Sequence, residues 1–296
     1  MCAAFEACGG YKRHSGSSSD DSVEGAILPA AAALELLQAY LLIHDDWMDG
    51  DETRRGAPSV HVALAERVQD RDLGNALAIL AGDLGVSLAQ ELFFRTRVES
   101  SRLVHAAAEF AAMQREVVIG QAIDMTGVSR DASSIEQMHD LKTGSYTVRG
   151  PMLIGAALAG ASPTVRDAIA RIAKPLGIAF QLRDDLLGLF GDPAVTGKPR
   201  GTDLRRGKRT ALVVELERDT RSERLFSRVF GDSSAPNDEV EALIVRAQEC
   251  GAKERVEVRL AELASASEQA LDAADLVGHG RELLRGAIGT LTDRAN

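Results

Sequence analysis

Apolar residues recur every three or four positions along most of the chain, which is the spacing of one face of an α-helix. The alternation typical of half-buried strands is almost absent, and so are hairpin signals. The pattern predicts helices over residues 26–49, 74–96, 99–126, 133–146, 150–161, 163–190, 208–219, 236–250, 252–277 and 280–292. We therefore expect an all-α protein.

The composition fits a helical core and limits the kind of partner. Of the 296 residues, 45% are hydrophobic but only 4% are aromatic, so the core is built from interchangeable aliphatic side chains, as in helical bundles. We expect one all-helical domain over residues 1–296, although this length would also allow two. With 34 basic and 44 acidic residues the net charge is −10, which disfavours nucleic acid bound on a broad basic surface. A phosphorylated substrate would therefore need metal ions or a local cationic patch.

The longest apolar run, residues 26–43, is interrupted by Pro29, Glu35 and Gln38 and is barely long enough to cross a bilayer. We interpret it as a core helix and expect no transmembrane segment. The first residues lack a basic stretch followed by an apolar one, so no signal peptide is expected. The three cysteines are odd in number and lack metal-ligand spacing, which is typical of a protein of the reducing cytoplasm.

Two polar segments interrupt the helical pattern. Residues 11–25 are rich in Ser, Gly and Asp and predict a flexible loop. Residues 191–209 are broken by Gly and Pro and carry six cationic side chains, which makes this the only strongly basic segment of the chain. We expect it to be a catalytic loop, because it directly follows the second of the two acidic clusters described next.

Two aspartate clusters end long apolar stretches, namely residues 44–49 and residues 181–185. Carboxylates at the ends of buried helices cost desolvation energy unless a cation answers them, and clustered Asp oxygens suit hard divalent cations. On a helix, Gln38, Asp45 and Asp49 share one stripe, with Asp46 turned about 100° to its side. A single Asp-Asp pair is usually a solvated helix end, but two matched clusters predict a metal site that faces a polyanion.

Cationic side chains accompany both clusters. Each alone could be an ordinary exposed charge, and this alternative weighs most for Lys208 and Arg205. Together they would surround an anion with one sign of charge. The candidates are Arg54, Arg55, Lys142 followed by Thr143, Lys198 and Lys208.

Residues 37–49, followed by Arg-Arg-Gly at 54–56, resemble the first aspartate-rich motif of the trans-polyprenyl (isoprenyl) diphosphate synthases. Lys142-Thr143, Phe180-Gln181 with the second aspartate pair, and residues 191–199 are similar to the other signatures of that family in order and spacing. The resemblance covers nearly the whole chain from about residue 3. It implies an isoprenoid synthase-type bundle of about ten or more helices around a central cavity, and a homodimer.

The resemblance also implies a prenyltransferase that condenses isopentenyl diphosphate with an allylic diphosphate and releases pyrophosphate. Magnesium, as three ions with substrate bound, would bridge the allylic diphosphate to both clusters. The metal ligands implied are Asp45, Asp46, Asp49, Asp184 and Asp185. The implied catalytic residues, which hold the allylic diphosphate or stabilise its cation, are Lys142, Thr143, Gln181 and Lys198, together with the substrate-binding Arg54. The implied contacts to isopentenyl diphosphate are Gln38 and Arg55, with Lys208 as a further substrate-binding cation.

Tyr40 is the candidate that sets product length. It lies five residues before Asp45, about 7.5 Å along a helix, where its ring should floor the pocket of a growing prenyl tail. By resemblance, an aromatic residue here implies short products of fifteen or twenty carbons. The alternative is a core tyrosine whose hydroxyl is hydrogen bonded.

The chain departs from the family pattern in two places. Position 188 is Gly where the second motif has a third Asp, which we expect to weaken metal binding without abolishing it. The Gly-Gly-Lys-x-x-Arg-Pro segment that binds isopentenyl diphosphate is not found before the first cluster, so we expect a truncated chain, a misplaced start or lost activity. Two alternative functions stay open: a terpene cyclase on the same fold, and an inactive regulatory subunit of a heteromeric synthase.

Overall fold

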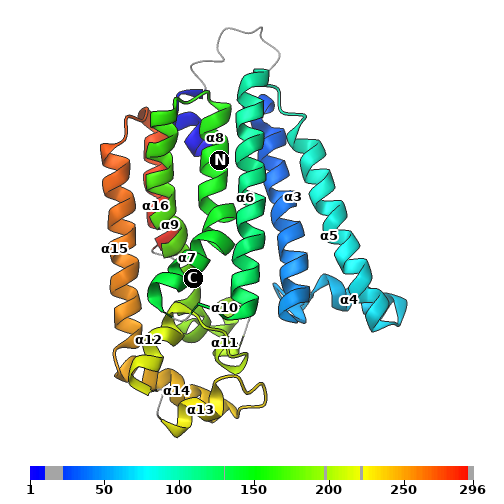
Figure 1. The fold of residues 1–296 in the computed structure, drawn as a ribbon, viewed down its shortest axis with the longest axis vertical. Coiled ribbons are helices and arrows are strands. Elements are labelled where there is room, and N and C mark those ends of the chain that lie inside the picture. Colours follow the sequence, from blue (N-terminus) through cyan, green and yellow to red (C-terminus); the bar gives the residue numbers. More distant parts are fainter. Residues whose placement is uncertain (11–22, 130, 197–198, 221–222, 293–296) are drawn as a thin grey trace.

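The computed structural model describes residues 1–10, 23–129, 131–196, 199–220 and 223–292. Long helices run along one axis, and short helices gather at one end (Figure 1). In the described ranges the strands are only β1 (Thr53–Arg54) and β2 (Ala57–Pro58), an antiparallel pair in which Arg54 faces Ala57. The all-α prediction is confirmed, and the hairpin is a small feature that the sequence pattern did not signal.

The helices have the following bounds. The long ones are α3 (Val23–Asp49), α5 (Arg71–Phe93), α6 (Ser100–Thr126), α9 (Pro163–Phe190) and α15 (Ala252–Ala273). The shorter ones are α1 (Cys2–Ala7), α4 (Val60–Val68), α7 (Ala132–His139), the π-helix η1 (Asp140–Arg149), α8 (Gly150–Leu158), α10 (Pro193–Thr196), α11 (Thr202–Arg205), α12 (Ala211–Thr220), α13 (Arg224–Val229), α14 (Asn237–Glu249) and α16 (Gly278–Thr292).

Most predicted helices are present within a few residues, but the single helix expected over 133–146 is wrong. The chain forms α7 and then widens into the π-helix η1, which is wedged between α6 and α9. A Cβ on Gly177 of α9 would lie 2.7 Å from the Cα of Gly144, so the two backbones are in contact. The loop expected over 11–25 is also too long, because α3 begins at Val23. The helices α1, α4 and α13 were not predicted, since each is shorter than the periodic windows that reveal a helix.

The core consists of two main clusters of buried apolar side chains, and α9 runs through both. One joins α1, α3, α6, α8, the first half of α9 and α16, with Phe5 among its fully buried residues. The other joins the second half of α9 to α11, α12, α13, α14 and α15. Because α9 is continuous despite Pro175, its carboxyl end is carried to the same end of the bundle as the carboxyl ends of α3 and α6 (Figure 1).

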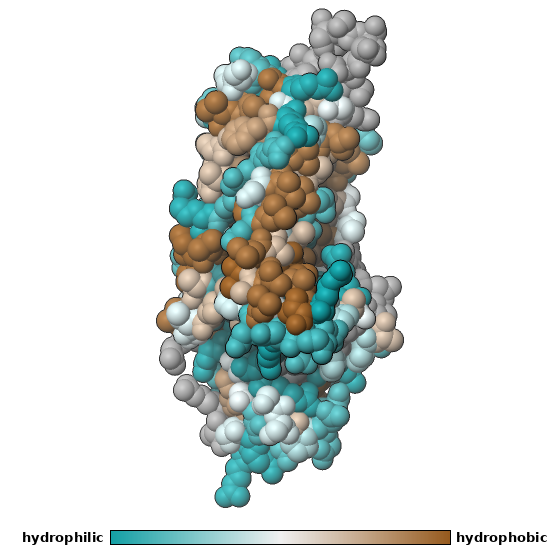
Figure 2. Space-filling view, turned by 90° about the vertical axis from the view of Figure 1, so that its right-hand side faces the viewer, coloured by the Kyte–Doolittle hydropathy of each residue, from teal (hydrophilic) through white to brown (hydrophobic). Residues whose placement is uncertain are grey.

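Two apolar helices, α3 and α5, pack on each other and leave much apolar surface exposed. By length and composition both could cross a membrane, and only 28% and 22% of their apolar windows are buried. Core helices of soluble proteins pass the same test, so this is weak evidence. The interpretation of residues 26–43 as a core helix holds for one face of α3: Leu37 is buried in the core, whereas Leu28 on another face is 63% exposed. Figure 2 shows hydrophobic residues gathered on this side of the molecule.

Candidate active site

The first aspartate cluster stands at the carboxyl end of α3, and a hairpin folds an arginine back onto it. Gly50, with φ +66°, ends the helix, and the β1–β2 hairpin returns the chain. As a result Arg54 Nε donates to both carboxylate oxygens of Asp46, at 2.9 and 3.1 Å. Asp46 is only 3% exposed. The hydrogen bond to Asp46 raises the pKa of Arg54 despite burial, so the Arg54 guanidinium stays charged at neutral pH.

The other two aspartates of the cluster face a lysine of η1. Lys142 Nζ lies 3.2 Å from Asp45 Oδ1 and 3.9 Å from Asp49 Oδ2. Its position follows from Gly120 of α6, where any Cβ would collide with the backbone nitrogen of Lys142. Asp45 and Asp49 therefore face Lys142 from one side of α3, and Asp46 is turned aside to Arg54.

Asp124 of α6, which the sequence analysis missed, joins two lysines. Its Oδ2 lies 2.5 Å from Lys142 Nζ and 3.3 Å from Lys208 Nζ, and Lys208 Nζ is also 3.3 Å from Asp49 Oδ2. Burial alone would raise the pKa of Asp124, but Lys208 and then Lys142 lower it below its ordinary value. Burial alone would lower the pKa of Lys208, but Asp124 and Asp49 raise it well above its usual range. Asp124 and Lys208 therefore stay ionised.

The second cluster divides into one exposed and one buried aspartate. Asp184 is exposed, whereas Asp185 is 4% exposed and accepts from Gln181 Nε2 at 3.0 Å and from the backbone N–H of Ala211 at 3.2 Å. Burial is the main cause that raises the pKa of Asp185 to about 8. Asp185 thus sits in the protein interior as a hydrogen-bonded carboxyl, whereas Asp184 faces outward.

A neutral histidine lies beside Asp185. His139 Nε2 is 3.6 Å from Asp185 Oδ2, and burial lowers the pKa of His139 to about 3. Both groups therefore carry no charge near neutral pH.

The two aspartate clusters are themselves close enough to act on one side chain. The pKa of Tyr146 in η1 is raised chiefly by burial, and Asp45 and Asp184 both add to the rise.

A carboxylate from another segment lies near Gly188, the position at which the second motif lacks its third aspartate. A Cβ on Gly188 would stand 3.5 Å from Oδ2 of Asp203, a residue of α11. Asp203 also contributes to the raised pKa of Lys208. A negative charge from another segment therefore lies where the motif lacks one.

The remaining predicted residues are placed less tightly. Gln38 is half-buried on α3, Thr143 is buried in η1, and Arg55 is exposed with φ +53°. Tyr40 lies at the contact of α3 with α5, its ring 4.8 Å from that of His44. Lys198 lies outside the described residues.

A cavity of about 410 Å³ opens beside this array. Its polar wall includes Asp49, Asp124 and Lys208, and its apolar wall includes Ile135 and Met138. The site therefore offers both a charged and an apolar surface to one ligand.

The donor set fits magnesium, which prefers carboxylate oxygens. The Lys142 ammonium already lies between Asp45 and Asp49, so a cation is accommodated at the point where the predicted ligands converge. Among the residues that the structure describes, no three acidic, histidine or cysteine side chains surround one point as a finished metal site. Lys142 and Lys208 must therefore move away from the aspartate carboxylates before a metal ion can bind these oxygens.

Residues 1–246 match the polyprenyl synthetase family. A short chain isoprenyl diphosphate synthase of Methanocaldococcus jannaschii is 36% identical over 230 residues, which cover 76% of this chain and 66% of that protein. A (2E,6E)-farnesyl diphosphate synthase of Mycobacterium tuberculosis is 34% identical over 235 residues, which cover 77% and 62%. The chain thus spans slightly less than two thirds of the length of these relatives.

The fold is similar to that of a solved geranylgeranyl pyrophosphate synthase. The Corynebacterium glutamicum enzyme, crystallised with isoprenyl diphosphate and magnesium, has a TM-score of 0.89 and 34% identity to this chain. The similarity covers 99% of this chain and 84% of that one.

Proposed function

Because the chain belongs to the polyprenyl synthetase family, we propose that it condenses isopentenyl diphosphate with an allylic diphosphate to give a trans-prenyl diphosphate of fifteen or twenty carbons. The observation that carries this proposal is the array of Asp45, Asp46 and Asp49 with Arg54 and Lys142 at one end of the bundle. Both signs of charge are present, as a complex of magnesium and diphosphate requires.

The cationic side chains would bind the allylic diphosphate. Lys142 and Lys208 are 15% and 32% exposed, so both can exchange a carboxylate partner for a phosphate oxygen. Arg54 would offer its guanidinium fork to the same diphosphate, and Lys198 would add a further cation. This set of donors stabilises the negative charge that collects on the leaving diphosphate as its carbon–oxygen bond breaks.

The first and second clusters would hold the metal. Asp45, Asp46, Asp49 and Asp184 are the proposed ligands, and Asp185 would act beside them from the interior. Bound magnesium, as three ions, would neutralise diphosphate charge and favour its departure. When Lys142 or Lys208 binds a phosphate oxygen, it releases the aspartate carboxylate with which it was paired. That carboxylate is then available to the metal.

The second substrate would lie against Gln38 and Arg55. Its double bond attacks the allylic carbon, and the proton lost afterwards goes to the departing pyrophosphate. Thr143 and Gln181 would orient the allylic end, and the aliphatic helices exclude water from the carbocation. Tyr40 would limit the length of the tail.

We propose that the protein forms a homodimer through α5. Leu80 and Leu84 are each 61% exposed and Leu88 is 44% exposed, on one apolar face of the helix (Figure 2). Such a face gains free energy when a second copy covers it. Asp83, with 58% of its side chain exposed, stands within this helix and disfavours a bilayer as the covering medium. A cytoplasmic location is proposed from the three free cysteines.

The test is turnover by the purified chain. Isopentenyl diphosphate with dimethylallyl, geranyl or farnesyl diphosphate and Mg²⁺ should give longer prenyl diphosphates and equimolar pyrophosphate. Asp45→Ala should abolish this turnover with unchanged helicity by circular dichroism. Cyclic hydrocarbon from farnesyl diphosphate alone, or no extension with any primer, would refute the proposal.

A further inference from the structure

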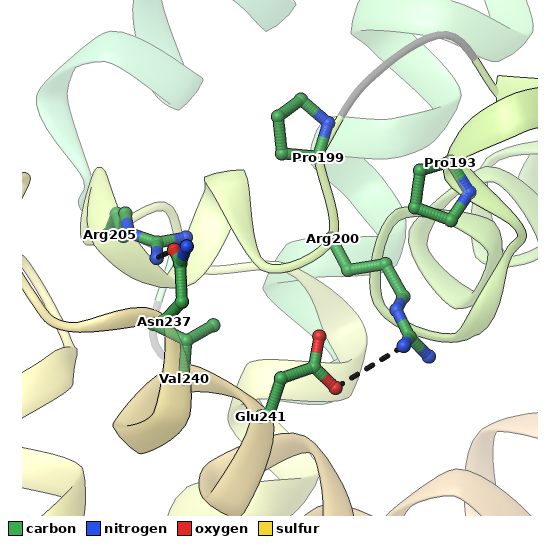
Figure 3. Close-up of a pocket in the computed structure, with 7 residues that line it drawn as sticks. All are labelled: Pro193, Pro199, Arg200, Arg205, Asn237, Val240 and Glu241. Atoms are coloured by element: carbon green, nitrogen blue, oxygen red, sulfur yellow. Dashed lines mark hydrogen bonds and ion pairs between the residues drawn. The ribbon is translucent and has the colours of Figure 1, made fainter.

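The basic segment, residues 199–209, is tied to α14 on one side. Arg200 Nη2 lies 3.3 Å from a Glu241 oxygen, and Arg205 donates to Asn237 Oδ1 at 2.5 Å and to the carbonyl of Ala235 at 3.2 Å. These contacts border a cavity of about 480 Å³ (Figure 3). Both arginines face α14, so neither is directed at the aspartate cluster of α3.

On its other side the basic segment is tied to the end of α3. Arg206 donates to Asp51 Oδ1, and its other terminal nitrogen lies 3.5 Å from the carbonyl of Gly50. The residues in this link are 155 positions apart in sequence. Asp51 is 8% exposed, and its backbone N–H donates to the carbonyl of Asp46 at 2.8 Å, so its carboxylate is a fixed anchor.

Asp51 also reaches the arginine of the first cluster. Its second oxygen, Oδ2, is 3.7 Å from Arg54 Nη2. The four side chains therefore alternate in sign, in the order Arg206, Asp51, Arg54, Asp46. Each inner charge is flanked by two of opposite sign: Arg54 is hydrogen bonded to Asp46 and also lies within ion-pair distance of Asp51.

We propose that Asp51 and Arg206 form a positioning pair that couples the two diphosphate-binding elements. Through Arg206, Asp51 docks the basic segment so that Lys208, two residues further on, faces the site; through Arg54, it keeps that guanidinium available to a diphosphate. Neither residue of the pair contacts substrate in this scheme. The inference rests on the proposed function for its substrate but not for its geometry.

Charge balance explains why the pair matters. Without Arg206, the buried Asp51 carboxylate loses one cationic partner and draws Arg54 more strongly away from the diphosphate site. Without the Asp51 charge, Arg54 keeps Asp46 and, at 4.0 Å, Asp45, and the basic segment loses the Arg206 contact beside the end of α3. Either loss should weaken diphosphate binding, and the second loss should add little because the link is already broken.

The experiment is a double-mutant cycle with Arg206→Gln and Asp51→Asn. We measure kcat and the KM for the allylic diphosphate, and the affinity for inorganic pyrophosphate in excess Mg²⁺ by calorimetry. Each single change should raise this KM and the pyrophosphate Kd about 10-fold. The double variant should show KM and Kd values no higher than those of the single variant that binds more weakly. Arg206→Lys should restore most of the affinity, because it keeps the charge.

The matched control is Arg200→Gln, which removes the same charge from the same segment but only from the Glu241 contact. It should leave KM unchanged. If Arg200→Gln raised KM as much as Arg206→Gln, the effect would come from net charge and the proposed pairing would be wrong. The pairing would also be wrong if the fold-changes of the two single variants multiplied in the double variant. If Asp51→Asn does not fold, the exposed Arg206 and its two variants still decide the matter. A wild-type chain without turnover would refute the proposed function, whereas the pyrophosphate cycle would still test the pair.

Discussion

Replacing Lys142 by Met should have opposite effects on metal and on diphosphate. Its ammonium lies 3.2 Å from Asp45, 3.9 Å from Asp49 and 2.5 Å from Asp124. A magnesium ion must compete with this internal cation for the carboxylates. A diphosphate, in contrast, gains a partner from it. Lys142→Met should therefore bind Mg²⁺ alone more tightly, and pyrophosphate with Mg²⁺ more weakly.

The size of each effect follows from the contacts. Two unit charges 4 Å apart attract by about 1 kcal/mol in water and by about 4 kcal/mol at the effective dielectric of a protein surface. Desolvation and side-chain entropy reduce this to about 1 kcal/mol for each partly exposed pair, so release of both Asp45 and Asp49, about 2 kcal/mol together, should tighten metal binding about 30-fold. Loss of a charged hydrogen bond to phosphate costs about 1.5–3 kcal/mol, which weakens diphosphate binding about 10- to 100-fold.

Calorimetric titration with MgCl₂ alone, and then with pyrophosphate at saturating Mg²⁺, measures both effects. Lys142→Arg keeps the charge and should show neither change in full. Lys174→Met removes an equal charge from an exposed position of α9, about 15 Å along that helix from Asp184, and should leave both affinities as in the wild type. Unchanged or weaker Mg²⁺ binding by Lys142→Met would refute the idea that Lys142 occupies the cation site.

Three further outcomes are expected. Because burial raises the pKa of Asp185 to about 8 in the folded protein, its stabilising contribution is complete below pH 4 and is lost as the pH rises to 8; Tm should fall over this range, and less so in Asp185→Asn. Gly188→Asp places a carboxylate beside Asp203 and should therefore lower the Tm measured in EDTA. It should also enlarge the increase in Tm that Mg²⁺ with pyrophosphate produces, and thermal denaturation under both conditions measures the two effects. Tyr40→Ala should shift products by at least one five-carbon unit in chromatography, and an unchanged product would assign Tyr40 to the core.

The sequence was informative where function depends on local spacing. Asp45 and Asp49 share a helix face because they are four residues apart, and Arg54 is close enough in sequence for a short hairpin to return it. The helix over 163–190 was equally predictable, since its apolar stripe is long and regular.

What the sequence could not supply depends on packing between distant segments. Asp124 is a single acid near the end of an apolar helix, and only the close approach of Gly120 to η1 brings it to Lys142. Nothing local distinguishes Asp185, held inside by Ala211, from the exposed Asp184. The π-helical winding of η1 likewise arises from contacts with α6 and α9 rather than from its own periodicity.

The charges around the site nearly balance, although the chain carries −10 overall. Five carboxylates and four cationic side chains are joined in one described network: Asp45, Asp46, Asp49, Asp51 and Asp124 with Arg54, Lys142, Arg206 and Lys208. A metal ion alone must displace a cation, and a diphosphate alone must displace a carboxylate. When both enter together, each takes the partners that the other releases, so few charges are left uncompensated in a partly buried site. We therefore expect metal and diphosphate to bind cooperatively, because the network of charges is neutral or nearly so only when both or neither are bound.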